Sequence, residues 1–129
     1  MRCAATSLVL ILASSFPAGA CEPPALERGK RIEGTRHVVL FRSVPAPTPL
    51  NASFALDVTV CARDGAAVAT PRVDAWMPAH RHGMNYRPSL TGTSAGRFRA
   101  DGLLLHMPGR WEFVFEVGGE RLTALDDID

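Results

Sequence analysis

The segment RWEFVFEV, residues 110–117, decides the fold class of this chain of 129 residues. Four large apolar side chains occupy every second position of the segment, from Trp111 to Val117, so they share one face of an extended chain. A period of two residues is typical of a β-strand with one buried face. Residues 110–117 are therefore predicted to form the strongest strand of a β-rich core.

A second clear alternation predicts another strand at residues 54–61. Phe54, Leu56, Val58 and Val60 share one face, which leaves the residues between them on the polar face. Shorter strands are predicted at residues 37–41, 72–76, 96–100, 103–105 and 120–125. About seven short strands separated by turns, with no helical periodicity after residue 20, predict an all-β fold, an antiparallel β-sandwich.

The amino-terminal residues have the features of an export signal. Arg2 precedes the apolar residues 8–13, a run too short to span a bilayer, and Ala-Gly-Ala at 18–20 supplies a cleavage site. We therefore expect a signal peptide at residues 1–20, a flexible segment at 21–35 and one domain at 36–129, with no membrane span in the mature chain. The expected location is periplasmic or otherwise extracytoplasmic.

Two cysteines remain after cleavage of the predicted signal. Cys21 would be the first residue of the mature chain, and Cys61 follows the parity of the polar face of its strand. An even number of cysteines in an oxidising compartment favours one disulfide, between Cys21 and Cys61. The alternative is a lipoprotein anchored through Cys21, and acylation of that sulfur would rule the disulfide out.

Charge and motif content exclude several classes of function. With Arg2 removed, 13 basic side chains face 13 acidic ones, so no overall field would attract nucleic acid or an anionic membrane. The serines lie in no nucleophile elbow, and the chain has no glycine-rich phosphate loop. The acidic residues 126–129 are predicted to be a solvated tail, and no enzymatic activity is predicted.

Histidine and methionine are concentrated in two loops. Of the four histidines of the chain, only His37 lies outside the segment MPAHRHGMNY, residues 77–86, and the later pair His106-Met107. Thioethers suit Cu(I), and imidazoles suit copper in either oxidation state, whereas thioethers are poor zinc ligands. The pattern predicts a copper site whose ligands are drawn from His80, His82, Met84, His106 and Met107, with Met77 as a weaker candidate.

The rival hypothesis treats the same loops as a metal-free interaction module of the cell envelope. Arg81, Tyr86 and Arg87 would contact a partner protein, while Met77 and Met107 would fill the end of the core. The two hypotheses differ in geometry, because a metal site requires the imidazoles to converge and a contact surface lets them splay.

Two motifs resemble the YtkA-like and FixH-like family of small exported bacterial domains. They are MPAHRHGMNYRPSL and GRFRADGLLLHMPGRWEFVFEV, which match the family patterns M-P-x-H-x-H-G-M and G-x-[YF]-x-x-x-G-x-x-x-H-M-P-G-x-W. The resemblance implies an immunoglobulin-like sandwich among proteins of copper handling and respiratory-oxidase assembly. It places Met77, His80, His82, Met84, His106 and Met107 at motif positions, and implies structural roles for Pro108, Gly109 and Trp111. A copper donor or acceptor of the cell envelope is the partner that it implies.

Overall fold

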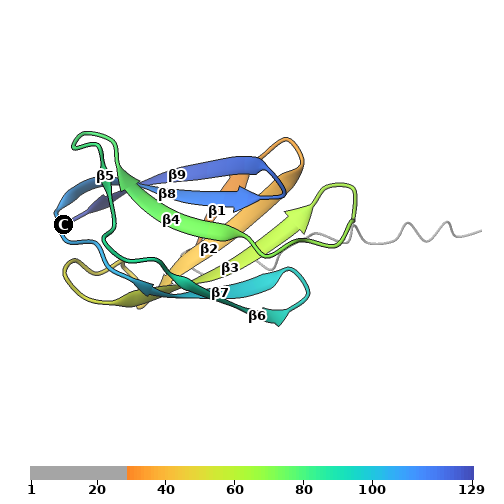
Figure 1. Ribbon diagram of the computed structural model, residues 1–129, viewed down its shortest axis with the longest axis horizontal. Coiled ribbons are helices and arrows are strands. Elements are labelled where there is room, and N and C mark those ends of the chain that lie inside the picture. Colours follow the sequence, from red (N-terminus) through yellow and green to blue (C-terminus); the bar gives the residue numbers. More distant parts are fainter. Residues whose placement is uncertain (1–28) are drawn as a thin grey trace, which may run out of the picture.

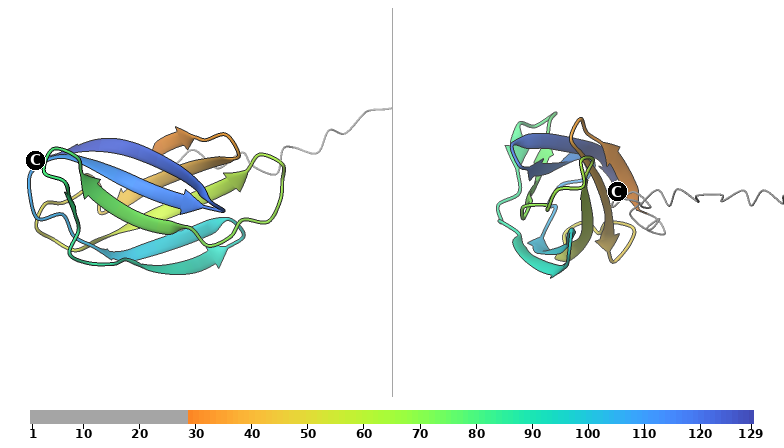
Figure 2. Two further views of the ribbon diagram at one scale, coloured as in Figure 1. Left: turned by 45° about the horizontal axis from the view of Figure 1, so that its top comes forward. Right: turned by 90° about the vertical axis from the view of Figure 1, so that its right-hand side faces the viewer.

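The computed structural model describes residues 29–129, which form nine β-strands in two antiparallel sheets packed face to face (Figures 1 and 2). The strands are β1 (Lys30–Glu33), β2 (His37–Val44), β3 (Phe54–Ala62), β4 (Arg72–Met77), β5 (His82–Gly83), β6 (Ser89–Ser94), β7 (Arg97–Leu103), β8 (Gly109–Val117) and β9 (Glu120–Ile128). One sheet has the order β1-β2-β3-β7-β6 and the other β5-β4-β8-β9. The predicted antiparallel β-sandwich is confirmed, and the finer immunoglobulin-like assignment stays a prediction.

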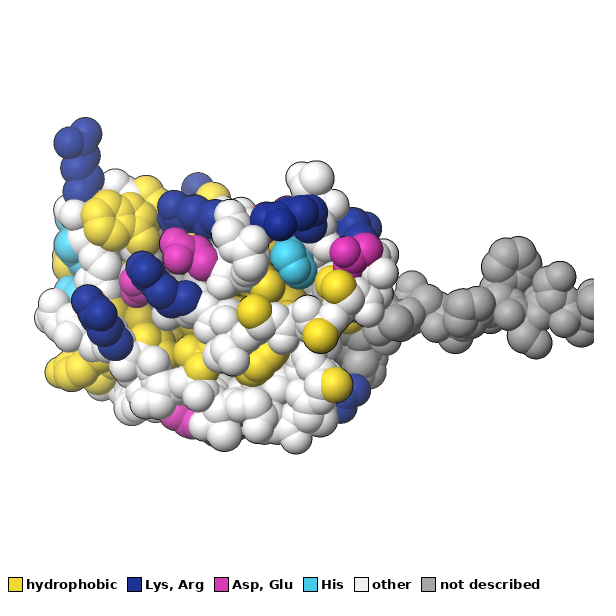
Figure 3. Space-filling model, turned by 45° about the vertical axis from the view of Figure 1, so that its right-hand side comes forward, with side chains coloured by type: hydrophobic (Ala, Val, Ile, Leu, Met, Phe, Trp, Pro, Cys, Tyr) yellow, Lys and Arg dark blue, Asp and Glu magenta, His cyan; other side chains and the backbone are white. Residues whose placement is uncertain are grey.

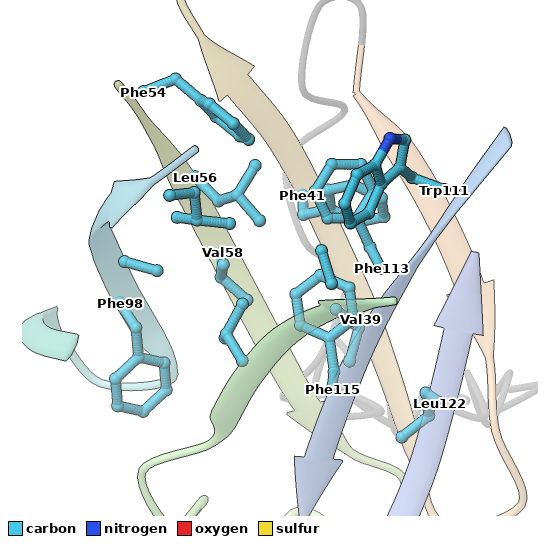
Figure 4. Packing of buried hydrophobic residues seen from close by; sticks show 14 of the residues in the cluster. Val39, Phe41, Phe54, Leu56, Val58, Phe98, Trp111, Phe113, Phe115 and Leu122 are labelled. Atoms are coloured by element: carbon cyan, nitrogen blue, oxygen red, sulfur yellow. The ribbon is translucent and has the colours of Figure 1, made fainter. Parts of the chain in front are cut away.

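The core lies between the two sheets and is rich in aromatic side chains (Figure 4). Trp111, Phe113 and Phe115 of β8 all point into it and are fully buried, as the alternation of the segment predicts. The ring of Phe41 on β2 lies 5.4 Å from that of Phe113 and 4.8 Å from that of Phe115, between centroids. These tilted ring contacts connect β8 of one sheet to β2 of the other.

Two expectations about the ends of the domain are wrong. Lys30–Glu33, inside the segment expected to be flexible, pairs with β2 as strand β1, with Ile32 opposite Val39. The carboxyl end is no solvated tail, because β9 extends to Ile128, which pairs with Gly109 and is 3% exposed. One apolar side chain in each segment suffices when a neighbouring strand supplies the hydrogen bonds.

The segment 1–28 lies outside the described residues, so the predicted signal peptide and Cys21 are not placed. Residues 29–129 contain no helix of the length and apolar character that crossing a membrane requires.

The outer face of the five-stranded sheet carries Cys61. It lies with Val38 and Leu40 in a small buried cluster on the side of the sheet opposite the core, as the parity of its strand predicts. Cys61 is disulfide-bonded. It is the only cysteine within residues 29–129, so its partner lies outside the described residues.

We expect peptide mapping of the exported protein under non-reducing conditions to find Cys61 joined to Cys21. Loss of a native disulfide from a small secreted domain costs about 2–5 kcal/mol, so the Cys61→Ser variant should unfold at lower denaturant concentration. A free Cys61 thiol, or a lipid on Cys21, would contradict the pairing. Mass spectrometry of the intact amino terminus separates these outcomes.

A partly buried hydrogen-bond network around Glu120 joins the β1–β2 turn to the β8–β9 turn. Glu120 accepts hydrogen bonds from the ring Nδ1 of His37 at 2.7 Å and from the backbone N–H groups of Thr35 and Arg36 at 2.5 and 3.1 Å. The guanidinium of Arg36 donates to the carbonyl of Gly118 at 2.9 Å. Burial of the Glu120 carboxylate acts to raise its pKa, but these hydrogen bonds outweigh burial and lower the pKa.

The lowered pKa of Glu120 predicts how stability depends on pH. A carboxylate whose pKa is lower in the folded than in the unfolded chain stabilises the fold above its unfolded pKa, and this contribution is lost as pH falls through the folded value. The Glu120→Gln variant should therefore be less stable than the wild type at pH 7, and the difference should shrink on acidification below the ordinary carboxylate range. Urea titrations of both proteins at about four pH values between pH 3 and pH 7 measure how the difference in stability depends on pH. A difference independent of pH would contradict it.

Candidate metal centre

The two histidine- and methionine-containing loops meet at one end of the sandwich. The first loop follows Met77, the last residue of β4, and the second precedes Gly109, the first residue of β8. Strands β4 and β8 are antiparallel neighbours, with Trp76 paired with Glu112. The end of β4 therefore lies beside the start of β8, at the left of Figure 1, where the β4–β5 loop is drawn.

A tight turn after β4 sets the positions of His80 and His82. The backbone N–H groups of His80 and Arg81 both donate to the carbonyl of Met77, at 3.2 and 2.9 Å. Arg81 adopts a left-handed conformation with φ of 54°, which reverses the chain so that His82 pairs with Met77 across β4 and β5. His80 is consequently exposed on the turn, whereas His82 is half-buried against the sandwich.

The second loop is anchored on both sides of His106 and Met107. The carbonyl of the buried Leu105 accepts a hydrogen bond from the N–H of Asn51 at 2.9 Å. On the other side, the indole N–H of Trp111 donates to the carbonyl of Met107 at 2.9 Å. Because Trp111 is a fully buried core residue, its indole connects the loop to the rigid interior of the fold.

The side chains of the two loops come together over the indole of Trp111. The Nε2 atom of His82 lies 3.3 Å from the thioether sulfur of Met107. The rings of His82 and His106 are stacked, with centroids 5.1 Å apart and an interplanar angle of 30°. Both imidazoles meet Trp111 edge to face, each with a centroid distance of 5.7 Å. His82, His106 and Met107 therefore form one cluster, called here the donor cluster.

The imidazoles of His82 and His106 make few or poor hydrogen bonds within the described residues. Nδ1 of His106 is buried and has no hydrogen-bond partner within the described part of the chain. His82 has only the carbonyl of Gly83, 3.3 Å from its Nδ1, and the sulfur of Met107, a weak acceptor. When Nδ1 of His82 carries the proton and donates to Gly83, the lone pair of Nε2 faces the thioether. Donor atoms left in this state are suited to a metal ion.

The separations fit two ligands that share one ion. Bonds of about 2.0 Å to nitrogen and about 2.3 Å to sulfur place two donors of a tetrahedral ion roughly 3.5 Å apart. Nε2 of His82 and the sulfur of Met107 are separated by 3.3 Å. Two imidazoles on one ion have ring centroids roughly 5–6 Å apart by the same bond lengths. His106 lies 5.1 Å and His80 5.9 Å from His82 by this measure.

The other two candidate methionines pack in or against the core. Met77 is 2% exposed, and its methyl carbon lies 2.8 Å from the position that a Cβ on Gly109 would take. Gly109, at a φ of 126°, therefore leaves room that Met77 fills. Met84 and Met107 are both half-buried against the same core cluster, and Met107 is distinguished by its sulfur, which lies 3.3 Å from Nε2 of His82. Sequence reasoning treated Met77 and Met84 as candidate ligands because it could not tell which faces of their segments point inward.

Within residues 29–129, no three or more His, Cys, Asp and Glu side chains form a group that could hold a metal ion. The donor cluster differs from such a group because one of its three members is a thioether. Trp111, identified from the sequence only as structural, is the residue that sequence reasoning undervalued: its place four positions after Met107 was the only available signal.

Comparison with known proteins adds no relatives. A scan against protein-family models matched no family, and searches of curated proteins and of solved structures found no match to this chain.

Proposed function

We propose that this protein binds one copper ion in the donor cluster and holds or delivers it without catalysing a reaction. The observation that carries the proposal is the approach of His82 to Met107 at 3.3 Å, beside the stacked ring of His106. These side chains come from loops on different strands, and convergence is what distinguishes a metal site from a contact surface. We propose that the site binds Cu(I) in particular, because the Met107 thioether favours that oxidation state.

The chemistry of the donor set favours copper over zinc. Structural zinc sites use thiolates, imidazoles and carboxylates, and a thioether is a poor ligand for zinc. Cys61, the only cysteine of the described residues, is disulfide-bonded and lies on the outer face of β3, away from the loops. Two imidazoles and one thioether leave copper as the first-row ion that best suits the cluster.

Binding or delivery is preferred to catalysis because the side chains that converge at the cluster, two imidazoles and a thioether, are donor groups for a metal ion. The predicted export signal and the resemblance to YtkA-like and FixH-like domains extend the proposal to the periplasm. The partner would be a copper donor or acceptor of the cell envelope, in respiratory-oxidase assembly or copper tolerance.

The metal-free interaction module remains the second candidate. It is favoured by the exposure of Trp76, 37%, and Tyr86, 54%, two of the three large exposed apolar side chains of residues 29–129. Exposed aromatic residues are enriched in protein interfaces. This reading leaves the buried, unpartnered Nδ1 of His106 without an explanation.

A competition titration with Cu(I) and Cu(II) tests the proposed function. Tight binding of one ion per chain, with X-ray absorption showing nitrogen and sulfur neighbours of copper, would support it. Binding no tighter than that of free histidine would reject it in favour of the interaction module.

A further inference from the structure

We propose that His80 is the ligand through which copper enters and leaves the donor cluster, by exchange with a partner whose surface is acidic. This inference rests on the proposed copper binding and adds a route and a partner chemistry to it. Three observations support it. His80 is more exposed than His82 and His106, its ring lies close to that of His82, and the neighbouring Arg81 has no ion pair within the described residues.

His80 is more exposed than the two other histidines of the loops. His80 is exposed, His82 and His106 are half-buried, and Nδ1 of His106 is fully buried. A ligand of an incoming protein can therefore reach an ion at the His80 side of the cluster without opening the sandwich. Approach from the other side is blocked by Trp111, which is fully buried beneath both His82 and His106.

The ring of His80 lies beside that of His82, but His80, His82 and His106 as placed do not form a group that could hold a metal ion, so the side chain of His80 has to rotate to reach an ion held by His82. The ring centroids of His80 and His82 are 5.9 Å apart, and the planes are inclined by 42°. Within residues 29–129, the His80 imidazole has no hydrogen bond, whereas that of His82 contacts both the carbonyl of Gly83 and the sulfur of Met107. His80 is thus free to bind or to release copper by rotating its side chain, while the half-buried donors keep their positions.

The exchange itself is a ligand substitution. A donor atom of the acceptor forms a bond to copper, and the bond between copper and the imidazole nitrogen of His80 breaks. The acceptor next replaces His82, His106 and Met107 in turn. No electron is transferred, the oxidation state of copper is unchanged, and each imidazole leaves as a neutral ring.

The charge beside His80 indicates the kind of partner. Arg81 is exposed and has no ion pair in the described residues. Figure 3 shows histidine and several basic side chains, with acidic side chains among them, at the surface on the left. A guanidinium next to the entry ligand repels a free copper ion and attracts a negatively charged surface. This arrangement favours transfer within a docked complex over capture of the ion from solution.

The test measures transfer rate and affinity separately. Wild type and His80→Ala are loaded with one Cu(I) without oxygen and mixed with bathocuproine disulfonate, a chelator with two negative charges that here stands in for an acidic acceptor. We expect the transfer rate of wild type to rise with chelator concentration, and that of His80→Ala to fall about tenfold. The affinity of His80→Ala from equilibrium competition should fall by less than that of His82→Ala, which should lose about 100-fold.

Arg81→Gln provides the electrostatic arm of the same experiment. Its transfer rate to the chelator should be lower than that of wild type at low salt and equal to it at about 1 M salt, where charges are screened over about 3 Å. Unchanged far-ultraviolet circular dichroism and melting temperature would verify that both exposed substitutions preserve the fold.

Several outcomes would overturn the inference. If His80→Ala transfers copper at the wild-type rate, His80 is not the exchange ligand. If His80→Ala loses as much affinity as His82→Ala, His80 is a holding ligand. An Arg81→Gln rate equal to that of wild type at low salt rejects the acidic partner. If wild type itself binds no copper, the proposed function fails, which this design distinguishes from failure of the exchange route alone.

Discussion

Replacing His82 with alanine should weaken the binding of Cu(I) at least about 100-fold, the largest effect expected of any single change at the proposed copper site. His82 is the only side chain whose ring contacts all the others of the candidate site: Met107 at 3.3 Å, and the rings of His80, His106 and Trp111. Its removal takes away one ligand and the ring against which His106 stacks. Equilibrium competition against a chromogenic Cu(I) chelator measures the loss.

Two matched controls make this result specific. His37→Ala removes the one histidine outside the two loops, which hydrogen-bonds the Glu120 carboxylate, so it should retain copper binding while losing stability. Met107→Leu removes the thioether at nearly constant volume and should weaken Cu(I) more than Cu(II), whereas Met84→Leu should leave both affinities unchanged. Equal losses for His37→Ala and His82→Ala would mean that the binding is nonspecific.

Phe113→Ala should lower the free energy of unfolding by about 3–5 kcal/mol, the largest effect expected in the core. The ring is fully buried between the sheets, with its centroid 5.4 Å from that of Phe41 and 6.4 Å from that of Phe54. Truncation removes the aromatic contacts and leaves a cavity between strands that cannot fully collapse. Urea denaturation at pH 7, with equal slopes for both proteins, measures the change.

The control for this prediction is Leu125→Ala on the neighbouring strand β9. Leu125 is 54% exposed, so its truncation should change the free energy of unfolding by about 0.5 kcal/mol or less. A Phe113→Ala variant that loses less than about 1 kcal/mol would show that the interior is looser than the packing of residues 29–129 indicates.

Strand alternation was sufficient to predict the two core strands with the clearest period of two, but the separate strands predicted at residues 96–100 and 103–105 were wrong, because one strand, β7 (Arg97–Leu103), runs through the expected turn. The side chains from Trp111 to Val117 in β8 and from Phe54 to Val60 in β3 point inward because a period of two leaves one face apolar. The same parity placed Cys61 outside the core. Three strands escaped prediction for the converse reason: β1 has one inward apolar residue, β5 has two residues, and β6 is a largely polar edge strand. These three strands form because neighbouring strands supply their hydrogen bonds, and their own amino-acid composition does not predict that pairing.

The candidate site, too, was predicted from the sequence only in part. Sequence clustering alone identified the two loops, because scarce soft and borderline donors were concentrated there. Only the pairing of β4 with β8 brought those loops to one end, and only the register of β5 placed His82 opposite Met77. Nothing local in the sequence distinguishes Met77, which is buried in the core, from Met107, whose sulfur faces His82.

The sequence by itself determined that this chain forms an all-β domain and that three of its four histidines lie, with three methionines, in two short segments. Both properties depend on residue type and on spacing along the chain. The tertiary structure decided which donors meet and which are buried, because distances between side chains far apart in sequence depend on strand order and register. The donor cluster of His82, His106 and Met107, with His80 exposed beside it, is therefore a product of strand pairing.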